Sequence, residues 1–287
     1  MSNSQARRPP KHTPVSVTVE PRTPTTEDPT PHNTHDKPLL RLAATLGIVG
    51  VALQVVMDRL HPHHVDPNNS VAVFREYAES HDWTWVHIGQ FAGTLFIVVG
   101  LIALARSLSR QRGVAGALGV VGALTGLLVA AVFTVQMAVD GVALKAAIDA
   151  WTHASAADQT AAFQVAESVR WTEKGLGGFF QMLEGATLLA LGLSIAFGHR
   201  YPKWLGWVGG LAGVTMIAGG TVTARTGFSA QAGLILTPAT VLLAVFVVGT
   251  FTLMGRRNRT VRPPATENLV YLTSTDASPA QGPRTSP

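Results

Sequence analysis

The sequence predicts an all-α membrane protein with six transmembrane helices, the first four being a parallel internal duplication of a two-helix hairpin, between two disordered tails. Three observations lead to this prediction. The chain is 47% hydrophobic and only 14% charged, its apolar residues gather in windows such as 91–105 and 114–138, and its basic residues collect in alternate connections. Windows of that length exceed an ordinary core strand, so a lipid bilayer is the expected solvent.

The two ends of the chain differ in composition from its centre. Residues 1–37 are rich in Pro, Thr, Ser and Asn, and they cannot bury enough apolar surface to offset the entropy of ordering. The first apolar segment begins near Leu39, too far along for an ordinary secretory signal, so it is expected to stay as a helix. Residues 256–287 are again polar and Pro-rich. We predict disordered cytoplasmic tails at 1–37 and 256–287 around a transmembrane domain at 38–255.

The central domain contains six apolar segments, each close to the roughly 20 residues that cross a hydrocarbon core. The predicted spans are 39–57, 84–106, 114–138, 175–197, 204–222 and 232–254.

Charge predicts how these spans are oriented. Of the 22 Lys and Arg residues, 16 fall on the side of the two tails. The positive-inside rule therefore places both termini in the cytoplasm, in a multi-pass protein of the cell membrane. The connections 58–83 and 139–174 are then external, and each is expected to form a short amphipathic helix on the membrane surface. Trp83 and Trp171, at the outer ends of spans, fit an interfacial aromatic belt.

The two external connections share a residue pattern. Gln-x-x-x-Asp closes the first span at 54–58 and the third at 136–140. The block Ala-Glu-Ser-x-x-Trp-Thr-x-x-x-x-Gly-x-Phe occurs without a gap at 78–91 and again at 166–179. Because the first and third spans cross in the same direction, the pattern predicts a parallel duplication about an axis near the membrane normal.

Polar residues within or at the ends of spans are candidates for a pocket that takes a small ligand, ion or proton. Glu184 lies about midway along the fourth span, where an unpaired carboxylate is costly, so we predict that it faces the bundle interior with Gln181. His87 and Gln90 of the second span are the expected partners. The alternative is a structural role, in which Glu184 forms a hydrogen bond between helices and Asp58 and Asp140 each cap a loop. The repeated outer pairs complete the candidate pocket: Gln54, Asp58, Gln136 and Asp140.

Histidines cluster in the first external connection. Imidazoles and carboxylates this close together could hold zinc or copper, or respond to pH. Their spacing matches no established zinc signature, and a polar loop beside a membrane is the alternative interpretation. The candidate metal ligands are His61, His63, His64, Asp66 and His81.

Several classes of protein are disfavoured. The chain has no cysteine, which excludes disulfides and iron–sulfur clusters. Its basic residues adjoin apolar spans without an RNA-binding pattern, so we expect no nucleic-acid partner. No Walker loop, His-Glu-x-x-His, nucleophile elbow or dinucleotide fingerprint is present, which disfavours an enzyme, and no cofactor is clearly implied. Glycine pairs such as Gly122/Gly126 and Gly206/Gly210 allow close helix approach within the chain or between protomers of a homo-oligomer.

These features favour a carrier or sensor in the lipid bilayer, with a polar pocket open to the outside. Two alternatives stay open: a metal- or redox-active membrane protein that uses the loop histidines, and a non-catalytic scaffold packed through its glycine faces. Across 39–255 the chain resembles uncharacterised bacterial multi-pass membrane proteins of similar length and loop arrangement. That resemblance implies no activity and no site residues.

Overall fold

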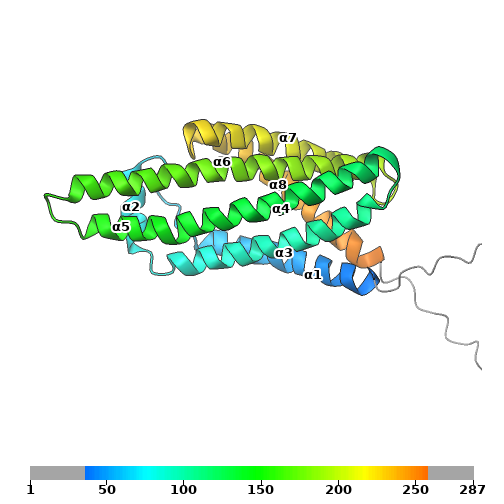
Figure 1. Cartoon of the computed structure of the whole chain (residues 1–287), viewed down its shortest axis with the longest axis horizontal. Coiled ribbons are helices and arrows are strands. Elements are labelled where there is room, and N and C mark those ends of the chain that lie inside the picture. Colours follow the sequence, from blue (N-terminus) through cyan, green and yellow to red (C-terminus); the bar gives the residue numbers. More distant parts are fainter. Residues whose placement is uncertain (1–35, 258–287) are drawn as a thin grey trace, which may run out of the picture. The chain divides into compact units, whose positions relative to one another are not determined.

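The computed structural model describes residues 36–257, and this part of the chain is built from helices without strands. The predictions of disordered tails fall almost wholly on residues 1–35 and 258–287, outside the described part. The elements, labelled in Figure 1, are α1 (Asp36–Leu60), α2 (Ser70–Glu79), α3 (Trp83–Ser109), α4 (Gly113–Ala138), a π-helical segment η1 (Val139–Leu144), α5 (Lys145–Thr152), α6 (Gln159–Phe197), α7 (Lys203–Thr226) and α8 (Ala230–Arg257).

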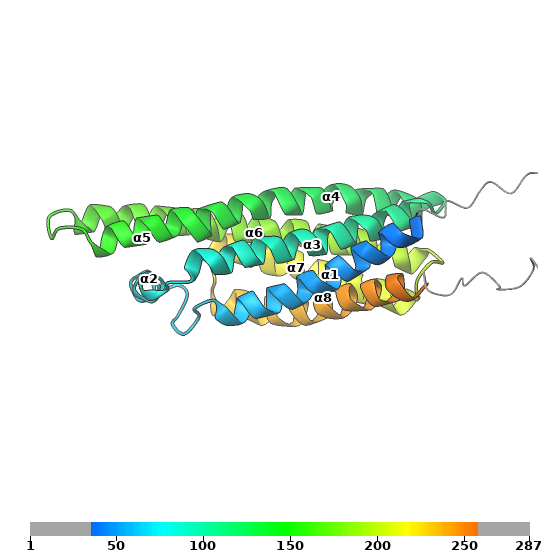
Figure 2. The same ribbon diagram turned by 90° about the horizontal axis from the view of Figure 1, so that it is seen from below.

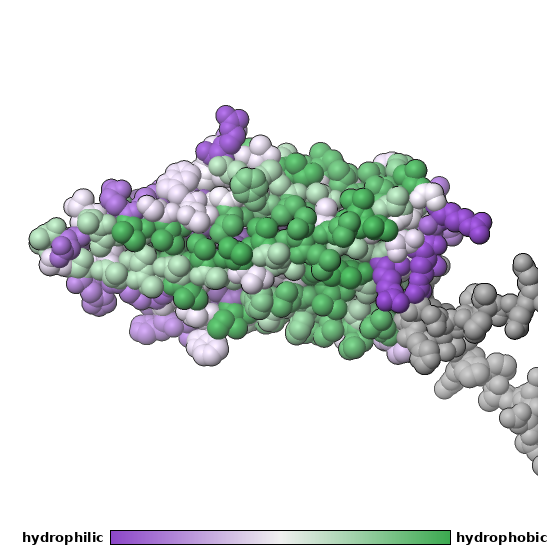
Figure 3. Space-filling model, in the orientation of Figure 1, coloured by the Kyte–Doolittle hydropathy of each residue, from purple (hydrophilic) through white to green (hydrophobic). Residues whose placement is uncertain are grey.

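Six of the helical stretches are long and apolar enough to cross a membrane, which confirms the predicted all-helical class and the number of apolar helices. They pack in chain order, each against the next, and α8 closes the arrangement by packing against α1 (Figures 1 and 2). Figure 3 shows apolar residues over the long helices, with hydrophilic residues gathered toward their ends. Leu104, Leu191 and Phe246 are among the fully buried residues of the main core.

Two of the six stretches are much longer than the predicted spans. Residues Gly113–Thr152 form 40 consecutive helical residues, and α6 has 39. At about 1.5 Å per residue, each is close to twice the roughly 30 Å of a hydrocarbon core. The amphipathic helix expected to lead into the fourth span begins at Gln159 but is continuous with that span as the first turns of α6. Residues 139–152, expected to be part of a connection, instead extend α4 through η1 and α5.

The extensions form a second core with α2. Phe74 of α2, Trp151 of α5 and Phe163 of α6 meet with ring centroids 5.7–5.9 Å apart. Leu144 and Ile148 are fully buried beside them. We call α2, η1, α5 and residues 159–174 the cap. The N-terminal residue that precedes α2 is Asn69, whose side chain accepts a hydrogen bond from the amide of Ala72 and so stabilises the start of the helix.

The prediction that Trp83 belongs to an interfacial aromatic belt is wrong. Trp83 is 1% exposed, and its indole Nε1 donates to the carbonyl oxygen of Asp140 at 3.0 Å. The hydroxyl of Thr84 donates to the next carbonyl, that of Gly141, at 3.1 Å. Both acceptors lie in η1, where the wider turn disturbs the regular hydrogen-bond pattern of an α-helix. Trp171, at the matching place in the sequence, is 48% exposed.

Glycines bring α6 and α7 into backbone contact. They recur every seventh residue on both helices, at Gly178, Gly185 and Gly192 of α6 and at Gly206, Gly213 and Gly220 of α7. A Cβ placed on Gly213 would lie 2.6 Å from the carbonyl oxygen of Gly185, and one on Gly192 would lie 2.7 Å from the carbonyl oxygen of Gly206. Gly206, one of the glycines expected to allow close helix approach, thus packs within the chain.

Candidate functional site

An inner cavity of about 340 Å³ lies among α1, α3, α4, α6 and α8. Its walls are mainly apolar, with a few polar groups between the aliphatic and aromatic side chains. This is the usual composition of a pocket for a small molecule, in which apolar walls supply contact area and a few polar groups set orientation. The apolar wall includes Val51, Val55, Ile97, Leu101, Val129, Phe133, Phe180, Leu188, Leu243 and Val247.

Glu184 lines this cavity from α6. In the described part of the chain, no side chain or backbone group forms a hydrogen bond or an ion pair with its carboxylate. Two threonines that also line the cavity, Thr187 and Thr240, donate to carbonyl oxygens of their own helices and not to Glu184. The carboxylate is therefore available to a group inside the cavity.

Gln54 places a second unsatisfied oxygen at the cavity. Its side-chain Nε2 donates to the hydroxyl of Thr94 at 3.2 Å, which fixes the amide across the α1–α3 contact. The amide oxygen of Gln54 is buried and accepts no hydrogen bond from the described residues. Both unsatisfied groups, the Glu184 carboxylate and the Gln54 oxygen, are acceptors.

A second cavity of about 390 Å³, here called the vestibule, adjoins the first and reaches into the cap. It is more polar, because its walls carry Glu76, Asp140, Arg170 and Glu173 together with Tyr77 and His61. The two cavities share four lining residues, so they meet at that point: Gln54, Asp58, Gln90 and Phe133.

The structure brings together most of the residues predicted for a ligand pocket. Glu184, Gln54, Asp58 and Gln90 line the inner cavity, and Gln136 and Asp140 line the vestibule. His87 lies against Asp140, with its Nε2 3.1 Å from the Asp140 Oδ2. Gln181 is separate from the other predicted residues: its Cβ lies 2.9 Å from where a Cβ of Gly220 would be, and it lines neither cavity.

The five predicted metal ligands do not form one cluster. His63 and His64 are exposed and stack with ring centroids 5.4 Å apart, and Nδ1 of His64 contacts the carboxylate of Glu76 at 2.8 Å. The Asp66 carboxylate accepts from the amide of Asn68, and His81 is exposed.

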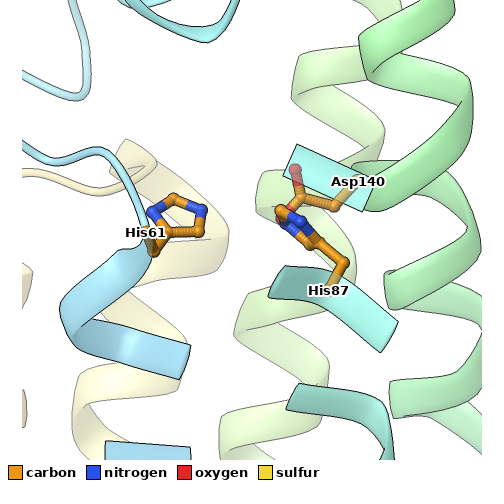
Figure 4. A group of neighbouring side chains, drawn as sticks. All are labelled: His61, His87 and Asp140. Carbon is orange, nitrogen blue, oxygen red and sulfur yellow. The ribbon is translucent and has the colours of Figure 1, made fainter. Parts of the chain in front are cut away.

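Of these five, His61 and His63 line the vestibule, and His61 also meets two residues that the sequence assigned to the ligand pocket. His61, His87 and Asp140 each offer a ligand atom within 4.8 Å of the other two (Figure 4).

Two titratable groups of the vestibule are shifted by their surroundings. Burial, followed by the nearby His87 ring, lowers the pKa of His61, which favours its neutral imidazole. Burial raises the pKa of Tyr77 to about 12, so its hydroxyl keeps its proton at neutral pH. The Tyr77 oxygen accepts a hydrogen bond from Nη2 of Arg170 at 3.4 Å.

Sequence reasoning missed the buried charges of α6. Arg170 is 2% exposed and pairs with Glu173, which is 3% exposed, while Arg170 also lies over the rings of Tyr77 and Phe228. In the sequence, Arg170 contributes only to the count of basic residues that predicts how the spans are oriented in the membrane. Its spacing of three residues from Glu173, which places both on one helix face, is the signal that points to the pair.

Comparison with protein-family models, curated proteins and solved structures finds no match to this chain. The nature of a ligand therefore has to be inferred from the chemistry of the two cavities.

Proposed function

We propose that the protein is an integral membrane carrier or sensor that binds a small amphipathic amine in the inner cavity, reached through the vestibule. The observation that carries the proposal is the unpartnered Glu184 carboxylate in the wall of an otherwise mainly apolar cavity. A carboxylate in the middle of a membrane bundle is costly unless it carries a proton or meets a donor. A protonated amine supplies that donor.

The remaining chemistry of the cavity supports an amine over an anion. The Gln54 oxygen and the Glu184 carboxylate both accept hydrogen bonds, whereas an anionic ligand would require donors. The apolar walls match a short hydrocarbon body. Carboxylates outnumber cations along the vestibule, where Arg170 is already paired with Glu173 and leaves Asp58, Glu76 and Asp140. This balance favours the entry of cations.

Thermal unfolding in detergent tests the proposal with octylamine, octanol and octanoate, which share a chain and differ in their head group. We expect octylamine to stabilise the protein most, by about 2.7 kcal/mol at roughly a hundredfold excess over its Kd. Glu184→Gln should remove most of the octylamine effect and leave the small octanol effect unchanged. Glu79→Gln, at an exposed residue that lines neither cavity, is the matched control. Equal stabilisation by octanoate, or an unchanged response of Glu184→Gln, would contradict the proposal.

The proposed topology has six membrane spans with both ends in the cytoplasm and the cap outside. An even number of spans puts both ends on one side, and most Lys and Arg residues lie on that side. Cysteine introduced at Ser155, in the turn between α5 and α6, should react with an impermeant maleimide added to intact cells. Cysteine introduced at Ser109, at the end of α3, should react only after the cells are opened. The reverse labelling pattern would refute the orientation.

We further infer that the α1–α3 and α4–α6 hairpins descend from one unit. The repeated sequence block supports this inference, and each hairpin pairs neighbouring helices. The copies have diverged. A loop separates α2 from α3, whereas α6 continues without a break through the corresponding stretch.

A further inference from the structure

Three separate segments meet beside the vestibule, whose wall includes His61 and Asp140. His61 directly follows α1, His87 lies in the second turn of α3, and Asp140 lies in η1. Figure 4 shows the His61 ring facing the His87 ring and the Asp140 carboxylate. The ring centroids of His61 and His87 are 5.3 Å apart. His87 is 2% exposed and Asp140 is 7% exposed.

The backbone selects the tautomer of both histidines. Nδ1 of His87 lies 2.7 Å from the carbonyl oxygen of Trp83, and Nδ1 of His61 lies 2.8 Å from the carbonyl oxygen of Pro62. A carbonyl oxygen can only accept, so each Nδ1 carries the proton and each neutral ring has a lone pair on Nε2. Histidines that bind metals are held in the same way, with the second nitrogen donating to a carbonyl or carboxylate.

The contact between His87 and Asp140 is not a hydrogen bond. Nε2 of His87 lies 3.1 Å from Oδ2 of Asp140, but the atoms are not aligned for a hydrogen bond, and Nε2 has no such partner among the described residues. The buried Oδ1 of Asp140 is unpartnered as well. Two atoms bound to one tetrahedral zinc ion at about 2.0–2.2 Å lie about 3.4 Å apart, so the observed separation fits two neighbouring ligands.

The surrounding structure holds this pair rigidly. Trp83 and Thr84 bind the carbonyl oxygens of Asp140 and Gly141, which connects the first turn of α3 to η1. A Cβ on Gly141 would lie 2.6 Å from the Cβ of His87, so a glycine is required for this approach. Local π-helical turns often occur at functional sites. His61 lies at the end of α1 and is only half-buried, so its side chain can complete the group by rotation.

We propose that His61, His87 and Asp140 bind a divalent first-row transition-metal ion. Two imidazoles and one carboxylate suit zinc, iron, nickel or copper and disfavour magnesium and calcium, which prefer oxygen ligands. Arg170, the nearby cation, is paired with Glu173, so Asp140 remains to balance the charge of the ion. Three protein ligands leave at least one coordination position open toward the vestibule. The proposal rests on this group alone and does not depend on an amine in the inner cavity.

Zinc and cobalt binding test the proposal on the full chain, purified without a histidine tag and treated with a chelator. We expect one Zn²⁺ per chain and, with Co²⁺, the visible absorption of a four- or five-coordinate ion. His61→Ala should weaken Zn²⁺ binding by more than about a hundredfold, beyond the effect of losing an outer-shell contact. Asp140→Asn should do the same. Gly141→Ala should weaken it by about 10–100-fold by displacing His87.

The exposed histidines provide the matched controls. The single variants His64→Ala and His81→Ala should bind Zn²⁺ as the parent does. Thermal unfolding without metal shows whether each variant is folded, and Zn²⁺ should stabilise the parent and these controls but not His61→Ala or Asp140→Asn. The proposal is overturned if the parent retains no ion, if folded His61→Ala binds like the parent, or if the control variants lose binding.

Discussion

Arg170→Met should lower the free energy of unfolding by about 3–5 kcal/mol, because it leaves a buried carboxylate without its partner. Arg170 and Glu173 are both nearly inaccessible and pair across one turn of α6. The substitution also removes the hydrogen bond to Tyr77 and the contact over the Phe228 ring. Equilibrium unfolding in mixed micelles measures the change.

A double variant separates the loss of the pair from the loss of packing. Arg170→Met/Glu173→Leu removes both charges and should be more stable than Arg170→Met alone, since replacing a whole buried pair by apolar side chains is often tolerated. Asp149→Asn breaks the pair of Lys145 with the 45% exposed Asp149 and should change stability by less than about 1 kcal/mol. If Arg170→Met costs no more than Asp149→Asn, the buried pair does not stabilise the cap.

Gly213→Ala should destabilise the bundle by about 1–3 kcal/mol, and Gly213→Leu by more. The added Cβ would lie 2.6 Å from the carbonyl oxygen of Gly185 and 2.6 Å from the amide nitrogen of Leu189. Both are backbone atoms of α6, so relief requires the two helices to separate. Unfolding in mixed micelles again provides the measurement.

Gly233→Ala is the control for the glycine contact between α6 and α7. In the described part of the chain, no heavy atom outside its own helical surroundings lies within 4 Å of a Cβ at Gly233 of α8. Alanine there should be neutral or stabilise the helix by up to about 1 kcal/mol. If Gly213→Ala and Gly233→Ala behave alike, close α6–α7 packing does not contribute to stability.

The sequence predicts the six apolar helices well because hydrophobic length is a local property. It does not predict how far two of them extend. The polar stretch at 139–174 contains Trp151, which is buried, and Phe163, which is partly buried, and both pack against Phe74 of α2. Such burial depends on contacts between segments that are distant in the sequence. The local pattern of polar and apolar residues in this stretch does not reveal those contacts.

The sequence likewise predicts only part of the candidate site. Glu184, Gln54 and Asp140 are recognisable in the sequence because polar groups beside apolar spans are unusual. The grouping of His61 with His87 is not recognisable, since it depends on where the end of α1 lies against α3. Trp83 resembles an interfacial aromatic in the sequence, but its role follows from the Asp140 carbonyl group in η1, which only the folded chain places beside its indole.

The π-helical segment also sets the rotational phase of the helix that follows it. In an α-helix each residue turns the chain by about 100°, so a segment with one residue more per hydrogen-bonded ring turns the next side chains to a different direction. Ile148 and Trp151 of α5 face the cap core in the phase that η1 gives them. Conversion of η1 to a regular α-helix would rotate α5 about its axis and withdraw Trp151 from Phe74. The turn that carries Asp140 thus couples the vestibule to the packing of the whole cap.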